Sequence, residues 1–281
     1  MNTYGFNQRF IDDIYYLLSC NAKTREQPNS YEFNEENAPP EAIESDLKAY
    51  SESLKTGANY GQHASLESWI SMDAQGNPRD VYPNVVNHHQ KVLDVVKDLQ
   101  PETICELGAG VGQVSKWVHK ICPSSKLTCV ESGDKHYPQM LENFGERSDV
   151  LPPDIKVNAN TIQHSIHDLK GIIEDNSQEL VYTCTVMMHL PYMVACATAC
   201  EIDRICSKYV LHVENKNDKI NCIVPGDTNT LGAYSAGPNM NNLPIDYRRI
   251  YDRLGYECLI YEEAPDPYAP CEYIYFLARK K

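Results

Sequence analysis

The stretch Glu106-Leu107-Gly108-Ala109-Gly110-Val111-Gly112 joins a short apolar run to a segment with helical spacing. Its glycines stand at alternate positions, where they allow positive φ angles and leave the backbone bare, so that a ligand can approach the chain closely. The helix that follows would direct its free N–H groups and its positive dipole end towards such a ligand. The stretch therefore predicts a small-molecule binding loop between a buried strand and a helix.

The spacing of the glycines distinguishes two kinds of nucleotide-binding loop. A dinucleotide dehydrogenase loop reads Gly-x-Gly-x-x-Gly and holds a pyrophosphate, whereas this loop reads Glu-x-Gly-x-Gly-x-Gly. The carboxylate of Glu106 would repel a pyrophosphate but suits a ligand with an ammonium and a sulfonium centre. On these residues the chain resembles the class I S-adenosylmethionine-dependent methyltransferase family, whose first motif has this form.

Short apolar runs alternate with helical patterns from Glu102 onwards, which is typical of a parallel sheet wound with helices. The predicted strands are 103–107, 126–131, 155–160, 179–185, 209–214, 257–261 and 272–278. The predicted helices are 83–99, 113–121, 136–144, 192–206 and 244–254. The fold class is therefore α/β, and the resemblance implies a Rossmann-like, seven-stranded, mostly parallel sheet with an antiparallel last strand.

The pattern of apolar residues divides the chain into two parts. Residues 101–281 are expected to form the S-adenosylmethionine-binding core. Residues 1–100 are expected to form an N-terminal helical cap that supplies much of the acceptor pocket, because helical spacing recurs over 6–20 and 42–54.

The resemblance extends over residues 101–281 and implies S-adenosylmethionine as the cofactor. Glu131 ends the second predicted strand, where a carboxylate can accept hydrogen bonds from both ribose hydroxyls. Asn160 ends the third predicted strand and Thr161 follows it, at the place where the family often has an Asp that meets the adenine amine. The residues expected at the cofactor are Glu106, Gly108, Gly110, Gly112, Glu131, Ser132, Asn160, Thr161, Thr185 and Val186.

Three side chains are candidates for chemistry on the acceptor. His189 follows the fourth predicted strand, at the edge where open α/β sheets bind ligands, and a neutral imidazole there can take a proton from an attacking hydroxyl. Alternatively, His189 only packs beneath the cofactor or caps the next helix. Glu214 shares a strand face with His212 and either orients a substrate or is a satisfied polar residue. His63 either lines a substrate lid or packs within the cap.

Composition weighs against several other functions. The formal net charge is −14, and no run of Lys and Arg supplies the basic face that is typical of nucleic-acid binding, so a nucleic-acid partner is disfavoured. No apolar run reaches the roughly 18 residues of a membrane helix, so no membrane partner is expected. The eleven cysteines are expected to be reduced thiols of a cytoplasmic protein.

No metal site is expected, although Cys196 and Cys200 share a predicted helix face, because no second ligand pair with zinc-type spacing accompanies them. A homodimer is compatible with the sequence.

The favoured function is methyl transfer from S-adenosylmethionine to a small-molecule acceptor. Methylation of oxygen is slightly preferred over nitrogen, because His189 can serve as a base. Two alternatives stay open. The chain could be an NAD-dependent oxidoreductase, since Glu131 could equally hold an NAD ribose, or a non-catalytic cofactor-binding scaffold that keeps the fold without turnover.

Overall fold

The computed structural model describes residues 12, 16, 87–134, 136–145, 155–187, 190, 192–216, 246–265 and 272–281. The helices predicted at 6–20 and 42–54 fall almost wholly outside these residues, as do His63 and His189.

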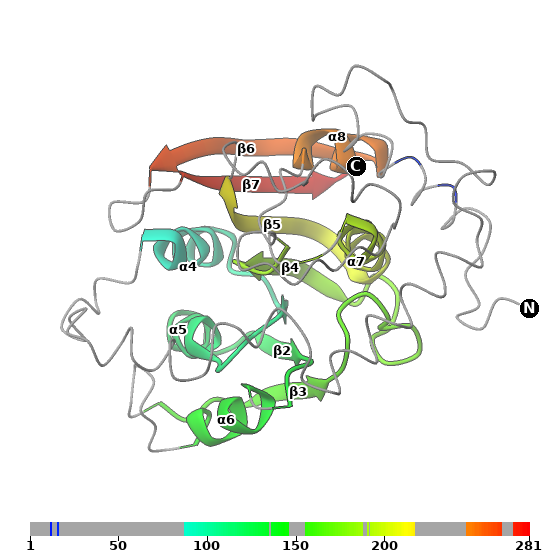
Figure 1. Cartoon of the computed structure of the whole chain (residues 1–281). Coiled ribbons are helices and arrows are strands. Elements are labelled where there is room, and N and C mark those ends of the chain that lie inside the picture. Colours follow the sequence, from blue (N-terminus) through cyan, green and yellow to red (C-terminus); the bar gives the residue numbers. More distant parts are fainter. Residues whose placement is uncertain are drawn as a thin grey trace, which may run out of the picture.

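A seven-stranded sheet forms the centre of the described structure, in the order β3-β2-β1-β4-β5-β7-β6 (Figure 1). The strands are β1 (Thr103–Leu107), β2 (Lys126–Glu131), β3 (Ala159–Gln163), β4 (Gln178–Cys184), β5 (Cys206–Lys216), β6 (Tyr256–Pro265) and β7 (Glu272–Lys280). The first five strands run parallel, whereas β7 pairs antiparallel with both β5 and β6. The predicted Rossmann-like sheet with an antiparallel last strand is thus confirmed.

Helices cover both faces of the sheet. They are α4 (Asn87–Leu99), α5 (Gln113–Ile121), α6 (His136–Asn143), α7 (Tyr192–Ile205) and α8 (Tyr247–Arg253). One apolar cluster joins α4, α5 and α6 to the sheet, and a second joins α7 and α8 to the opposite face (Figure 1). No helix in the described part of the chain is long and apolar enough to cross a membrane.

The central strands are apolar on both sides because both faces are covered. On β1, Ile104 belongs to the cluster under α4 and α5, while its neighbour Cys105 belongs to the cluster under α7. On β4, Leu180 and Val181 alternate between the two clusters in the same way. Because these strands are packed on both faces, their ends are held in place, and the loops that follow them start from fixed positions.

Helix α4 packs with the core, although it precedes residue 101. Val92, Leu93 and Val96 are buried in the same cluster as Val114 and Val118 of α5. The last part of residues 1–100 therefore covers one face of the sheet.

The third strand begins later than predicted. It spans Ala159–Gln163 and not 155–160. The Val157 amide donates to the carbonyl of Phe144 at 3.0 Å, so this part of the chain docks onto the end of α6 before pairing with β2 begins. The apolar residues Ile155 and Val157 gave a strand-like pattern, but they pack against α6 and its neighbours.

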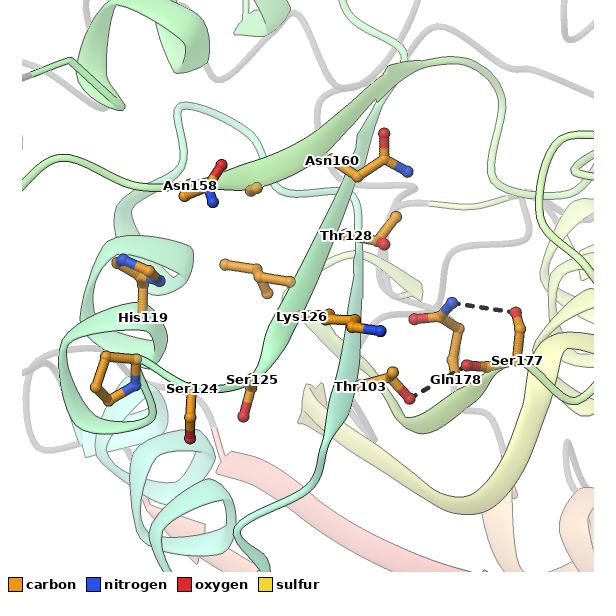
Figure 2. A pocket seen from close by; sticks show the side chains of 13 residues that line it. Thr103, His119, Ser124, Ser125, Lys126, Thr128, Asn158, Asn160, Ser177 and Gln178 are labelled. Atoms are coloured by element: carbon orange, nitrogen blue, oxygen red, sulfur yellow. Dashed lines mark hydrogen bonds between the residues drawn. The ribbon is translucent and has the colours of Figure 1, made fainter.

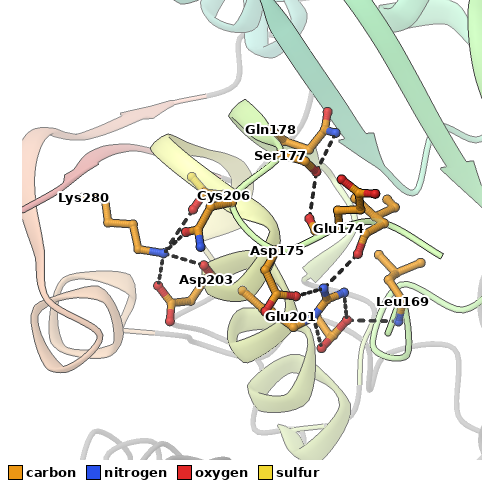
Figure 3. Close-up of polar contacts among 12 residues, drawn as sticks. Leu169, Glu174, Asp175, Ser177, Gln178, Glu201, Asp203, Cys206 and Lys280 are labelled. Carbon is orange, nitrogen blue, oxygen red and sulfur yellow. Dashed lines mark hydrogen bonds and ion pairs between the residues drawn. The ribbon is translucent and has the colours of Figure 1, made fainter. Parts of the chain in front are cut away.

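An ion-pair network fastens the end of α7 away from the glycine loop. Arg204 donates to Glu201 at 2.8 Å and to Asp175 at 2.6 Å, and Glu201 also accepts from the Leu169 amide at 3.0 Å. Nearby, Lys280 of β7 donates to the carbonyl of Asp203 in α7 at 2.7 Å (Figure 3). These contacts join the end of α7 to the chain before β4 and to β7. They hold the sheet together at the edge opposite the glycine loop.

Candidate functional site

The ends of β1 and β4 form the point where the chain reverses its direction across the sheet. The strands β2 and β3 follow β1 on one side, and β5 follows β4 on the other. Open α/β sheets bind ligands outside the carboxyl ends of the strands at such a point. The loop after β1 and the turn after β4 meet here, because a Cβ atom added at Gly108 would lie 2.6 Å from Cγ2 of Val186.

The three loop glycines have different roles, although all have positive φ, with values of 76°, 56° and 81°. At Gly108 a side chain would collide with Val186, and at Gly112 with Phe144. At Gly110 nothing lies within 4 Å of an added Cβ atom. Gly108 and Gly112 thus make room for neighbouring side chains, and only Gly110 of the three borders space that a ligand can use.

Glu131 connects the glycine loop to the end of β2. One carboxylate oxygen accepts from the Gly110 amide at 2.8 Å, and the other accepts from the Gly133 amide at 2.7 Å. A carboxylate has about four lone-pair positions, so each oxygen keeps capacity for a further donor. Ser132 is half-buried in the same turn. The carboxylate of Glu131 therefore lies beside the one open glycine of the loop.

Further contacts fix the path of the loop. The amides of Gly108 and Ala109 donate to the carbonyl of Val130 at 2.8 and 3.0 Å. The Asn143 side chain, at the end of α6, donates to the carbonyl of Val111 at 2.9 Å. The loop is held before any ligand binds, so little ordering is needed on binding.

Glu106 is turned into the protein. Its side chain is covered, with 2% of the residue exposed, and it accepts a hydrogen bond from the hydroxyl of Ser115 in the first turn of α5. Burial raises the pKa of Glu106 to about 7, and the nearby charge of Glu131 also raises it, while the Ser115 hydroxyl acts in the opposite direction. Glu106 therefore anchors the start of α5 from below the loop.

Asn160 and Thr161 do not end their strand. Asn160 pairs with Thr128 near the start of β3, and both line an open cavity of about 740 Å³ at the amino-terminal edge of the sheet (Figure 2). Asn160 is thus at the edge opposite the glycine loop. The carboxyl end of β3 is Gln163, whose side chain donates to Asp134 at 3.0 Å, and His164 follows it. Because the third strand was predicted to end at residue 160, Gln163 and His164 were not expected at its carboxyl end.

The turn after β4 has an unusual backbone. Thr185 has a φ of 58°, which is rare for a β-branched residue and costs on the order of 1–3 kcal/mol. Its amide donates to the carbonyl of Val213 at 2.8 Å, and the next amide, of Val186, donates to Glu214 at 3.0 Å. Both side chains are half-buried. This turn brings Val186 over Gly108.

Glu214 lies beneath that turn and not on its surface. Only 1% of the residue is exposed, and it accepts from the hydroxyl of Thr183 at 2.7 Å as well as from the Val186 amide. It shares this contact region with His212, as their common strand face predicts. Thr183 was not singled out in the sequence, although a hydroxyl inside the apolar run 180–184 is the signal that could have revealed it.

His189 and His63 are outside the described residues, so their roles in the site stay predictions. On either side of His189 in the sequence, Met187 and Leu190 are buried. Within the described ranges, no group of three or more His, Cys, Asp or Glu side chains is placed to hold a metal ion. Cys196 and Cys200 are residues of α7 and belong to the apolar cluster between this helix and the sheet.

The raised pKa of Glu106 leads to a prediction about stability. Between its unfolded pKa of about 4.5 and its folded pKa of about 7, the folded protein binds more protons than the unfolded chain, so this group lowers stability as pH rises. Glu106→Gln should therefore be more stable than wild type at about pH 8, by on the order of 2–3 kcal/mol, and this gain should shrink towards about pH 5. Denaturant unfolding at both pH values measures it.

The exposed residue Glu174 provides the control, because Glu174→Gln removes one carboxyl group from the surface. Burial lowers the pKa of His212 to about 3, and this makes the stability of the protein rise with pH, opposite to the effect of Glu106. The comparison therefore uses the difference in stability between variant and wild type at each pH, in which the His212 contribution cancels. A Glu106→Gln gain that does not depend on pH would contradict the assigned ionisation.

Comparisons with known proteins were made for the sequence and for the structure. No protein-family model matches the sequence, and no curated protein matches it either. Solved structures do match. A magnesium protoporphyrin IX methyltransferase from Synechocystis PCC 6803 with bound S-adenosylhomocysteine aligns with a TM-score of 0.54 and 13% identity, over 81% of this chain and 100% of that one.

Two further structures are similar. A putative sarcosine dimethylglycine methyltransferase from Galdieria sulphuraria has a TM-score of 0.51 and 12% identity, over 69% of this chain and 84% of that one. A 1,6-didemethyltoxoflavin-N1-methyltransferase from Burkholderia thailandensis, with S-adenosylhomocysteine bound, has a TM-score of 0.50 and 12% identity, over 76% and 86%. The chain therefore has the fold of class I S-adenosylmethionine-dependent methyltransferases.

Proposed function

We propose that this protein transfers a methyl group from S-adenosylmethionine to a small-molecule acceptor. The observation that carries the proposal is the pairing of Gly110 with Glu131. Gly110 borders open space at the strand reversal, and the Glu131 carboxylate beside it keeps acceptor capacity on both oxygens. A nucleoside with two adjacent ribose hydroxyls fits such a carboxylate.

The charges around the loop favour a cationic ligand over a pyrophosphate. The Glu131 carboxylate contacts the loop directly through the Gly110 amide, close to the place where a dinucleotide would put its phosphates. The Glu131 carboxylate at this position would repel a pyrophosphate and attract an ammonium or sulfonium centre. This argument weighs against the alternative of an NAD-dependent oxidoreductase.

The residues of this chain divide the work as follows. Glu131 would hold the ribose, with Ser132 in the same turn, and Gln163 and His164 border the region beyond it, where the base would lie. Gly108, Gly110 and Gly112 shape the loop under the rest of the cofactor, and Thr185 and Val186 close it on the side of β4. The bound cofactor supplies an activated methyl group, so the protein mainly aligns the acceptor and excludes water.

The acceptor is proposed to be a small molecule. The structures of similar fold include enzymes named for magnesium protoporphyrin IX, for 1,6-didemethyltoxoflavin and for sarcosine and dimethylglycine. The net charge of −14 disfavours a nucleic-acid acceptor. Residues of the N-terminal segment, including His63, would line the acceptor pocket. Oxygen is favoured over nitrogen as the methylated atom because His189 follows the β4 turn directly.

A transfer assay separates an enzyme from a non-catalytic scaffold. The full chain is incubated with S-adenosylmethionine that carries a labelled methyl group and with fractions of a small-metabolite extract. We expect label to enter a small molecule in an amount that follows the S-adenosylhomocysteine formed. Tight cofactor binding with no transfer to any fraction would favour the scaffold.

Gly110 gives the sharpest test of the loop. Gly110→Ala should weaken S-adenosylhomocysteine binding about tenfold or more, because the added methyl group enters the space that the ligand would occupy. Gly171→Ala is the matched control, since Gly171 also has a positive φ, of 80°, and also has nothing within 4 Å of an added Cβ atom. Both variants should lose a similar amount of stability, because an alanine at a positive φ is strained at either position. Calorimetric titration should find weaker binding in the Gly110 variant alone, and equal affinities would remove Gly110 from the site.

Glu131 is tested by substitution with Ala and Gln. Glu131→Ala should weaken cofactor binding by about 1.5–3 kcal/mol, because charge-assisted hydrogen bonds to the ribose are lost together with the contact to the Gly110 amide. Glu131→Gln keeps one acceptor oxygen and should lie between wild type and Ala. Glu142→Gln on the exposed side of α6 is the control. If the dissociation constants of all variants equal that of wild type, the ribose contact is elsewhere.

His189 tests the mechanism for an oxygen acceptor. His189→Ala should reduce turnover by roughly 10²–10⁴-fold, and His189→Asn nearly as much, because an amide cannot take up the proton. The pH–rate profile should lose an ascending limb near the ordinary imidazole pKa of about 6.5. Normal turnover in both variants would make His189 a packing residue.

A further inference from the structure

A continuous chain of buried hydrogen bonds runs from α8 to the turn after β4. The Tyr251 hydroxyl contacts Nε2 of His212 at 2.7 Å, and Nδ1 of His212 contacts the Thr183 hydroxyl at 2.7 Å. Thr183 donates to Glu214 at 2.7 Å, and Glu214 accepts from the Val186 amide at 3.0 Å. We call these four side chains, Tyr251, His212, Thr183 and Glu214, the relay.

The relay is enclosed on every side by the fold. Thr183 of β4 and His212 of β5 are direct partners in the parallel register, and both are fully buried. The His212 ring stacks on Tyr247, with centroids 4.6 Å apart, and the rings of Tyr251 and Phe276 also contact it, with centroids at 5.2 and 6.2 Å. Burial lowers the pKa of His212 to about 3, so the imidazole is neutral at neutral pH.

The contacts fix the direction of every proton in the relay. The Thr183 hydroxyl has one proton and gives it to the carboxylate of Glu214, so its oxygen must accept from Nδ1 of His212. A neutral imidazole with its proton on Nδ1 has an acceptor at Nε2, and the Tyr251 hydroxyl donates there. The two hydroxyls and the imidazole therefore all donate towards Glu214, which in turn accepts from the Val186 amide.

The end of the relay is the strained turn of the candidate site. Thr185 is held at a φ of 58°, and such a conformation persists only where surrounding contacts impose it. The bond from Val186 to Glu214 is one of these contacts, and Val186 is the residue that packs over Gly108. An ordered Glu214 therefore sets the position of Val186 against the glycine loop.

We propose that Tyr251, His212 and Thr183 are positioning residues that act through Glu214. They keep the Thr185–Val186 turn in its strained conformation and so shape the wall of the cofactor site. The consequence for the cofactor rests on the function proposed above, whereas the consequence for the turn does not. Helix α8 is thereby linked to the turn after β4, whose Val186 packs against the same apolar cluster as α8.

The test uses two substitutions of Thr183 that separate hydroxyl from shape. Thr183→Val has nearly the same volume but interrupts the relay, while Thr183→Ser keeps the hydroxyl and loses a methyl group. We expect Thr183→Val to weaken S-adenosylhomocysteine binding about tenfold, because the Val186 wall shifts, and Thr183→Ser to stay within about threefold of wild type. Thr128→Val makes the same exchange at the opposite edge of the sheet and should leave the affinity unchanged.

Two further readouts report on the relay without any ligand. Nitrogen NMR of the His212 ring should find the proton on Nδ1 in wild type and in Thr183→Ser. Hydrogen exchange at the Val186 amide should be faster by about tenfold or more in Thr183→Val than in Thr183→Ser. A loss of stability alone would accelerate exchange throughout the sheet, so the amide of Val181 in the middle of β4 serves as an internal reference.

Tyr251→Phe decides the matter if Thr183→Val does not fold, because it removes a single hydroxyl at the far end of the relay. It should change the His212 nitrogen shifts and accelerate Val186 exchange relative to Val181. Unchanged Val186 exchange and unchanged affinity in the folded variants would overturn the proposal. If wild type binds no S-adenosylhomocysteine, the proposed function fails, and the exchange and tautomer measurements still decide on the relay.

Discussion

The hydrogen bond from the Gly110 amide to the Glu131 carboxylate joins the ends of two adjacent strands across the sheet. It sets the loop after β1 at a fixed distance from the turn after β2, and the same carboxylate holds that turn through the Gly133 amide. A bulky ligand could not approach this point if the residue at position 110 had a side chain. The combination of a bare backbone and an adjacent carboxylate is therefore the condition for the proposed cofactor site.

The sequence predicted most of the elements that build this site, because parallel strands buried on both faces have an unmistakable apolar pattern. The strands at 103–107 and 126–131 and the helix at 113–121 have the predicted bounds. The position of Glu131 at the end of its strand followed from those bounds. The glycine spacing indicated the loop, but it could not tell that Gly108 and Gly112 accommodate Val186 and Phe144.

Contacts between distant segments account for what the sequence did not predict. Val157 has the apolar character of a strand residue, yet its amide bonds to the end of α6, and this shifted the third strand and misplaced Asn160. The motif shows that Glu106 is acidic, but only the structure reveals that its side chain is buried and hydrogen-bonded to Ser115. The relay needs the register that places Thr183 beside His212, and no local pattern contains that register.

Calorimetric titration of the full chain with S-adenosylmethionine, S-adenosylhomocysteine and NAD tests the central claim most directly. The negative charge and the free acceptor positions of Glu131 predict that both sulfur-containing nucleosides bind at one site per chain and that NAD does not compete for it. Saturable binding of NAD at this site, or no binding of S-adenosylhomocysteine, would contradict the proposed cofactor and with it the function.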